Sequence, residues 1–363
     1  MERSRRASGS WSFRLVIRPT MDELSHRLRE FVERLTAEEP VSAASVLVGT
    51  ADRVEGEAFA GRLRSGSPAG PDQGTLFDLA SITKPFMATL ALLLEGQGHL
   101  SLEQTVGEVW AQANARLAHK TLAGLLRHGA GFQAWAPLYH SCQLPEEVGE
   151  LLLGSQLLID EPDLYSDLDY ILWGLAAESR LGRSLADLAV THLAPVLASG
   201  ALVVRPGPGA AVAECLLDTA REVELAAGLG IELELRPRPE PGEPQDGNAR
   251  FLGGLGGHAG LFATARAVWG LAREWLQPRV LAEAAVEKAL SGSGPFLLGW
   301  RRPREEGRDG QALGAEAFGH IGFTGGSVWI DRGTGRIWVL LAHRTLVTAD
   351  LDPWRRELVE LAF

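Results

Sequence analysis

The stretch FDLASITKPFMATLALLLEG, residues 77–96, contains a helical pattern that is almost entirely apolar. It predicts a helix that begins at Ser81 and ends near Glu95, before two glycines. In such a helix Ser81 and Lys84 are three positions apart and lie on one face, one turn from each other. The spacing brings an amine within reach of a hydroxyl at a helix N-terminus, which favours an alkoxide as it develops.

The use of lysine at position 84 strengthens this interpretation. The chain has 35 basic residues, and only three of them are lysines. A lysine in a partly desolvated cleft has a lowered pKa and is able to accept a hydroxyl proton, whereas an arginine stays charged. The competing interpretation is a capping serine followed by a surface lysine, and the Ser-x-x-Lys spacing alone does not exclude it.

A second stretch, Tyr165-Ser166-Asp167, precedes an apolar helical pattern. A phenol near a lysine ammonium has a lowered pKa and is suited to general-base work. The competing interpretation is an amphipathic tyrosine that caps a core helix. Taken alone, the stretch favours that structural role.

A third stretch, HIGFTGGS at residues 320–327, leads into a predicted hairpin. Glycines at the start of a strand allow a substrate to approach the backbone closely. A backbone N–H here, together with the N–H of Ser81, is suited to form an oxyanion hole. The competing interpretation is a glycine-rich turn with an incidental histidine.

The three stretches in this order resemble the serine β-lactamase and penicillin-binding-protein superfamily. The resemblance is closest to class C-like serine hydrolases, which include esterases and D-amino-acid peptidases. Three flanking stretches carry it further: FDLA at 77–80, LLRHGAG at 125–131 and GHAGLF at 257–262. The resemblance covers about residues 22–363.

The resemblance implies a role for each matching residue. Ser81 is expected to be the acylated nucleophile, Lys84 its activating partner and Tyr165 the proton shuttle. The backbone N–H groups of Ser81 and Phe323 are expected to form the oxyanion hole. Four further residues are expected to bind or orient the substrate: Asp167, His320, Gly322 and Thr324.

Three departures from the family pattern bear on the substrate. Asp167 stands where asparagine is commoner, Ile321 replaces a threonine whose hydroxyl would contact a lactam carboxylate, and His320 replaces a lysine and is expected to be neutral at pH 7. We therefore expect a serine hydrolase that cleaves an ester or an amide/peptide bond through an acyl-enzyme, with weak or no β-lactamase activity. The alternative is a catalytically silent penicillin-fold protein that binds a ligand or acts as a scaffold.

The composition limits the other function classes. Apolar residues make up 45% of the 363 residues and charged residues 22%, and the net charge of −11 argues against a nucleic-acid partner. Two cysteines, the absence of a secretory apolar segment and the absence of a spanning segment predict a soluble cytoplasmic protein without a membrane partner. We expect a small-molecule ester, amide or peptide substrate, no metal and no cofactor; the pattern predicts no oligomeric state.

Two other enzyme classes have weak signals. Residues 254–259, GLGGHA, fit the loose dinucleotide fingerprint, but a polar stretch precedes them where a buried strand is needed. The Gly-x-Ser-x-Gly elbow of α/β-hydrolases is absent from the sequence.

The order of predicted elements indicates an α/β (α+β) fold. Helices are predicted at 20–36, at 264–276 and from Asp352 onward, and strands at 43–49, 231–235, 327–330 and 337–341. These predict an antiparallel sheet flanked by the N- and C-terminal helices, with an inserted, mainly helical subdomain. We expect residues 1–20 to be a disordered tail, with Met21 as a possible true start. Residues 21–363 are expected to form one catalytic domain, with an α/β part at 21–75 and 250–363 and a helical part at 76–249.

Overall fold

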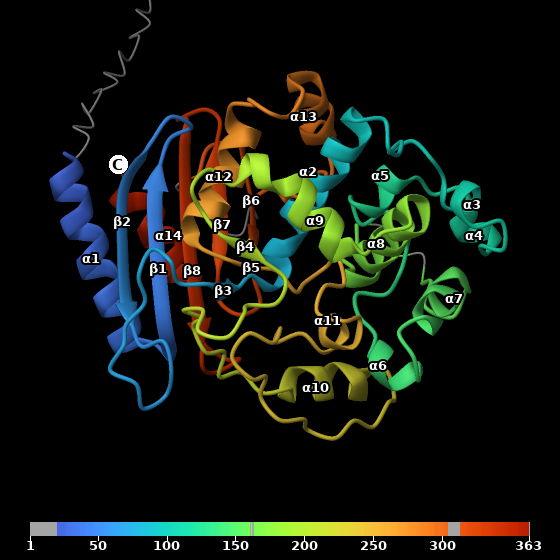
Figure 1. Ribbon diagram of the computed structural model, residues 1–363, viewed down its shortest axis with the longest axis horizontal. Helices are drawn as coiled ribbons and strands as arrows, with labels where there is room; N and C mark the ends of the chain where they lie inside the picture. Colours follow the sequence, from blue (N-terminus) through green and yellow to red (C-terminus); the bar gives the residue numbers. More distant parts are fainter. Residues whose placement is uncertain (1–19, 160, 162, 304–312, 363) are drawn as a thin grey trace, which may run out of the picture.

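A five-stranded antiparallel sheet organises the left half of the molecule in Figure 1. The computed structural model describes residues 20–159, 161, 163–303 and 313–362. The strand order is β2-β1-β8-β7-β6, so the N-terminal strand pairs with the C-terminal one. The strands are β1 (Val41–Gly49), β2 (Val54–Gly61), β6 (Ala317–Ile321), β7 (Ser327–Asp331) and β8 (Arg336–Arg344).

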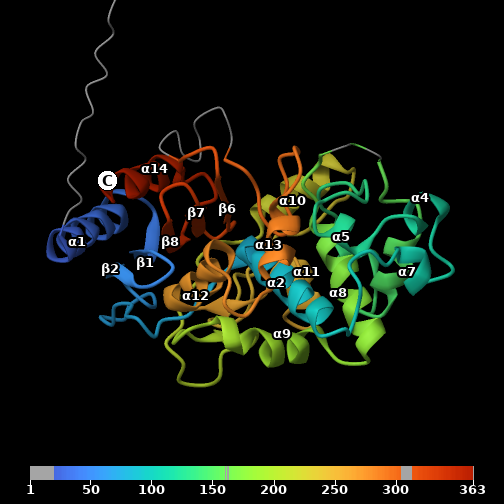
Figure 2. The same cartoon turned by 90° about the horizontal axis from the view of Figure 1, so that it is seen from above.

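Helices cover both faces of this sheet, as Figure 2 shows from above. Helices α1 (Met21–Glu38) and α14 (Asp352–Leu361) pack on one face, and α12 (Ala265–Leu276) packs on the other. Side chains of a strand alternate between faces, so Val46 lies in the core under α1 and α14, whereas Leu47 lies in the core on the α12 side. Because both faces are buried, the central strands are almost wholly apolar. The predicted fold class is confirmed.

Local sequence signals set the helix starts. Thr20 and Glu23 form a capping box at the start of α1, and Thr264 caps α12 by accepting the N–H of Ala267. The helix predicted after Asp352 is α14, with a proline in its first turn. The three helices predicted at 20–36, at 264–276 and from Asp352 onward are confirmed.

The other half of the molecule is mainly helical and lies beside the sheet (Figures 1 and 2). A small three-stranded sheet, β3 (Phe77–Asp78), β5 (Phe262–Ala263) and β4 (Leu202–Val203), is found at the junction. Helix α2 (Thr83–Gly96) runs through the larger core, which explains its apolar sequence. The remaining helices are α3 (Val106–Val109), α4 (Ala115–Ala118), α5 (Leu122–Leu125), α6 (Leu138–Ser141), α7 (Glu147–Leu153), α8 (Asp167–Leu181), α9 (Leu185–Leu193), α10 (Ala220–Gly228), α11 (Gly247–Phe251) and α13 (Glu283–Leu290).

Two strand assignments need correction. Residues 231–235 alternate in polarity but form no strand; they follow α10 as a loop, and Leu235 is 61% exposed. Without a neighbouring strand to pair with, the alternation has no structural consequence. His320 does not begin a strand either: it lies near the end of β6, opposite Val328 of β7.

Some predictions fall on residues outside the described ranges. The predicted tail at 1–20 lies there except for Thr20. Within the described ranges, every helix is too short or too polar to span a membrane.

Candidate active site

Ser81 lies in a tight turn that precedes α2. The turn is a 3₁₀ helix, Ala80–Ile82, and the α-helix begins only at Thr83, so the predicted helix start at Ser81 is shifted by two residues. Ala80 has a φ of 44°, in the left-handed region that alanine disfavours. A strained residue next to a reactive side chain is a frequent feature of functional sites.

Lys84 is the centre of a hydrogen-bond network. Its Nζ donates to Ser81 Oγ at 3.0 Å, to Asp167 Oδ1 at 2.7 Å and to the carbonyl oxygen of His258 at 3.3 Å. The Nζ atom also lies 4.7 Å from the centroid of the Tyr165 ring. The Lys84 side chain is fully buried. The structure thus brings together the hydroxyl, the amine and the phenol that the three sequence stretches carry.

The charge of Lys84 differs from the expectation. Burial favours the neutral amine, but the Asp167 carboxylate beside it and the Tyr165 hydroxyl outweigh burial, and the pKa of Lys84 is raised. Lys84 is therefore an ammonium in the resting site. The expected lowering of its pKa is wrong because the sequence gives no sign that Asp167 contacts it directly.

Tyr165 is half-buried between two histidines. Its ring centroid lies 4.4 Å from that of His128 and 6.0 Å from that of His320. Burial raises the pKa of Tyr165, and the nearby Lys84 ammonium compensates only in part. The expected lowering of the pKa of this phenol is therefore wrong as well, and Tyr165 keeps its proton at neutral pH.

The segment 322–324 lies directly against the Ser81 turn. A Cβ atom on Gly322 would be 2.6 Å from the Leu79 carbonyl oxygen, so only glycine allows this approach. The Thr324 hydroxyl donates to the Asp78 carbonyl oxygen at 2.9 Å. These contacts hold Phe323 beside Ser81, and both residues line the same cavities. Thr324 itself is 1% exposed and faces inward, away from those cavities.

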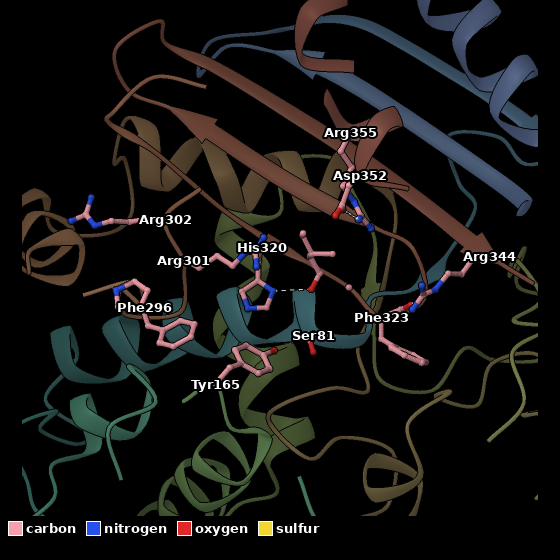
Figure 3. A pocket seen from close by; sticks show the side chains of 13 residues that line it. Ser81, Tyr165, Phe296, Arg301, Arg302, His320, Phe323, Arg344, Asp352 and Arg355 are labelled. Carbon is pink, nitrogen blue, oxygen red and sulfur yellow. Dashed lines mark hydrogen bonds and ion pairs between the residues drawn. The ribbon is translucent and has the colours of Figure 1, made fainter. Parts of the chain in front are cut away.

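His320 lines the larger of these cavities with Ile321 (Figure 3). Burial, and then the positive charges of Lys84 and Arg301, hold the pKa of His320 well below its usual range. Its Nδ1 lies 3.0 Å from the carbonyl oxygen of Ile321. The ring is thus neutral at pH 7.

Two cavities meet at Ser81, and Tyr165 and Phe323 also line both. The larger, about 450 Å³, we call the arginine chamber; the smaller, about 190 Å³, we call the acidic chamber. The charged residues of the arginine chamber are Arg301, Arg302, Arg344, Arg355 and Asp352. The charged residues of the acidic chamber are Asp167, Glu222, Asp246 and Arg221.

The acidic chamber contains a group of atoms with metal-ligand chemistry. Oxygen atoms of Asp167 and Asp246 and a ring nitrogen of His258 lie within 4.8 Å of one another. However, Asp167 is bound to the Lys84 ammonium, and His258 Nε2 lies 2.8 Å from Asp246 Oδ1. Burial lowers the pKa of His258, but Asp246 outweighs burial and raises it overall, which favours a ring without a free lone pair. The group is an ion-pair network and fits a metal poorly.

Sequence reasoning missed several residues of this site. The carbonyl oxygen of His258 binds Lys84, and Asp78 binds the Ser81 turn. Both lie in stretches that carry the family resemblance, which was the only available signal. The four arginines come from a loop, the end of β8 and helix α14, which converge only in the folded chain, and no local pattern marks them.

A family model described as Beta-lactamase matches residues 28–362. No curated protein sequence matches the chain.

Several solved structures share the fold. EstCE1, described as a hydrolase with promiscuous acyltransferase activity, has a TM-score of 0.73 at 19% identity, over 94% of this chain and 99% of that one. A class C β-lactamase from Rhodobacter sphaeroides has a TM-score of 0.69 at 18% identity, over 91% of this chain and 97% of that one. A penicillin-binding-protein homologue from Caulobacter crescentus has a TM-score of 0.69 at 19% identity, over 95% of this chain and 98% of that one. The family match spans most of the chain and confirms the resemblance read from the motifs: the chain belongs to the Beta-lactamase family.

Proposed function

We propose that this protein is a serine hydrolase that cleaves an ester or an amide/peptide bond through an acyl-enzyme on Ser81. The observation that carries the proposal is the chain of contacts from Ser81 Oγ to Lys84 Nζ at 3.0 Å and from Lys84 Nζ to Asp167 Oδ1 at 2.7 Å. A nucleophile, an amine and a proton acceptor in hydrogen-bond contact are the arrangement that activates a hydroxyl.

In the proposed acylation, the resting ammonium first has to lose a proton. Lys84 passes it to Asp167, and the neutral amine then accepts the Ser81 hydroxyl proton. The Ser81 oxygen forms a bond to the substrate carbonyl carbon, and the carbonyl π electrons move to its oxygen. The N–H groups of Ser81 and Phe323 stabilise that oxyanion.

In the proposed collapse of the intermediate, Tyr165 donates its phenolic proton to the leaving oxygen or nitrogen. Lys84 returns a proton to the phenolate, and Asp167 returns one to Lys84, so the proton taken from Ser81 is balanced by the one on the leaving group. Water then attacks the acyl-enzyme with the same groups in reverse order. Asp167 thereby acts on the amine, in addition to its expected contact with substrate.

The substrate is proposed from the lining of the two chambers. His320, Ile321 and Gly322 line the arginine chamber, and neither the neutral imidazole nor the isoleucine offers the ammonium or hydroxyl expected for a lactam carboxylate. This supports weak or no β-lactamase activity. Lys84 neutralises the charge of Asp167 and four guanidinium groups line the larger chamber, so the negative charge of Asp167 does not argue against an anionic substrate.

A substrate panel tests the proposal. The wild-type protein and Ser81→Ala are incubated with p-nitrophenyl esters, a D-alanyl peptide and nitrocefin. We expect turnover of an ester or the peptide, little or none of nitrocefin, and none by the variant. A folded wild-type protein that turns over no member of the panel would support a catalytically silent ligand-binding protein.

A further inference from the structure

Asp78 is a buried carboxylate that the proposed reaction does not use directly. Asp78 is the last residue of β3, two residues before the 3₁₀ turn that carries Ser81, and it is 3% exposed. Its Oδ1 accepts the N–H of Ala80 at 2.9 Å, and its Oδ2 accepts the N–H of Gln245 at 2.7 Å. The carboxylate therefore joins the nucleophile turn to the loop that carries Asp246.

The backbone of Asp78 makes two further connections. Its carbonyl oxygen accepts the Thr324 hydroxyl, in the segment that holds Phe323, at 2.9 Å. Its N–H donates to Nε2 of His343, on β8, at 3.1 Å. Four segments that are distant in sequence thus meet at this one residue.

We propose that Asp78 is a positioning residue, whose carboxylate holds the Ser81 turn and the loop at 245–246 in the geometry that acylation needs. The inference rests on the proposed function. Ala80 has to keep a left-handed conformation for Ser81 to face the chambers, and alanine does not favour that conformation. The hydrogen bond from the Ala80 N–H to Asp78 opposes the relaxation of this strain.

A carboxylate suits this position better than an amide. Each Asp78 oxygen faces a backbone N–H, so both have to be acceptors. In an asparagine one of the two groups is an NH₂, which would face an N–H whichever way the amide turned. Asp78→Asn therefore loses one of the two hydrogen bonds at almost unchanged volume.

The surroundings of Asp78 add a pH-dependent readout. Burial raises the pKa of Asp78 to about 6, and the charged or titratable groups facing it are Asp246, Arg250, His343 and Cys215. The carboxylate is ionised at neutral pH and gains a proton below about pH 6, which weakens one acceptor. An acid limb in the acylation rate is the expected consequence, and it should disappear in Asp78→Asn.

Asp331 provides a matched control. It is 1% exposed, and its two oxygens accept the N–H groups of Gly333 at 2.9 Å and Gly314 at 3.2 Å. It ends β7 at the β7–β8 turn and lines neither chamber. Asp331→Asn thus removes the same kind of hydrogen bond without touching the site.

The experiment compares the rate at which a fluorophosphonate labels the wild type, Asp78→Asn and Asp331→Asn between about pH 5 and 8. We expect Asp78→Asn to react roughly 10- to 100-fold more slowly at neutral pH, the effect of a misplaced reacting group, and to lose the acid limb. Asp331→Asn should react within about threefold of the wild type and keep the limb. Thermal unfolding of all three proteins shows whether they are folded.

The outcomes separate the two proposals. A wild type that labels, with Asp78→Asn labelling within about threefold of it and keeping its acid limb, overturns the positioning role alone. A wild type that neither labels nor turns over substrate overturns the proposed function, and the positioning role with it. If Asp78→Asn does not fold, the pH profile of the wild type replaces it: a labelling rate that shows no acid limb near pH 6 while the protein stays folded overturns the proposal.

Discussion

The arginine chamber and the acidic chamber share Ser81 but differ in the charge of the side chains that line them. In the acidic chamber each of three carboxylates has a cationic partner: Asp167 contacts Lys84, Asp246 contacts His258, and Glu222 contacts Arg236. In the arginine chamber, Arg344 donates to the carbonyl oxygens of Phe323 and Val347. A carbonyl group accepts a hydrogen bond without neutralising a charge. Asp352 pairs with Arg355 at 2.6 Å, but it is one carboxylate among four guanidinium groups, so the charged side chains that line this chamber carry a net positive charge.

The difference suggests that proton transfer and substrate recognition take place on different sides of Ser81. Of the proton-transfer groups, Ser81 and Tyr165 lie on the wall that the two chambers share, and Asp167 lies on the acidic side. Lys84 is buried in contact with Ser81 and Asp167, so opposite charges compensate each other at hydrogen-bond distance. The arginine side has the larger volume and a lining with four guanidinium groups and one carboxylate, which suits recognition of a substrate arm. Variants on the shared wall should therefore affect every substrate, and variants in one chamber should affect only some.

The largest effect is expected for Lys84→Arg. The charge is kept, but an arginine does not give up its proton to become a base, so acylation should be lost for all substrates. Fluorophosphonate labelling and ester turnover measure the loss, and circular dichroism checks the fold. Near wild-type labelling in this variant would remove the amine from the mechanism.

Tyr165→Phe should come next. Removing the phenolic proton should lower turnover by roughly two to four orders of magnitude, the usual contribution of a positioned acid or base. The effect should be similar for esters that probe either chamber, because Tyr165 lines both. Steady-state kinetics with two esters provide the measurement, and a change below about threefold would count against the role.

Asp167→Asn should change the pH dependence of the acylation rate more than it changes the maximum rate. Without the carboxylate, burial dominates and the pKa of Lys84 falls, but the amine then has to release its proton to solvent. Below that pKa the labelling rate should drop about tenfold per pH unit, and it should approach the wild-type rate at high pH. A variant profile parallel to that of the wild type from about pH 6 to 9 would exclude Asp167 as the proton acceptor.

The smallest effect is expected in the arginine chamber. Arg302 donates to the Gly292 carbonyl oxygen at 2.7 Å and lines the chamber. Arg302→Gln should raise KM for an ester with a carboxylate arm by roughly three- to tenfold, as for loss of one partly exposed charge contact, and leave a neutral ester unaffected. Equal effects on the two esters would mean that the chamber does not select charge.

The two chambers also differ in how well the sequence predicts them. Ser81 and Lys84 are one helical turn apart, so local spacing predicts their contact, and the family resemblance adds Tyr165 and Phe323. Local sequence signals also predict the helices that cover the two faces of the five-stranded sheet: α1, α12 and α14.

The remaining features depend on tertiary contacts. The ammonium state of Lys84 depends on a 2.7 Å contact with Asp167, 83 positions away. Strand β2 was missed because its glycine, alanine and glutamate residues have low strand propensity, and pairing with β1 stabilises it. The arginine chamber is formed by segments around residues 301, 344 and 355, which no local pattern connects.

The central claim is that Ser81 is the nucleophile of a working site, and mapping a covalent adduct tests it most directly. Wild type and Ser81→Ala are treated with a fluorophosphonate, digested and analysed by mass spectrometry. Our account predicts one stoichiometric adduct on the peptide that contains Ser81, and none on the variant. An adduct on another residue, equal labelling of the variant, or a folded wild-type protein without any adduct would contradict it.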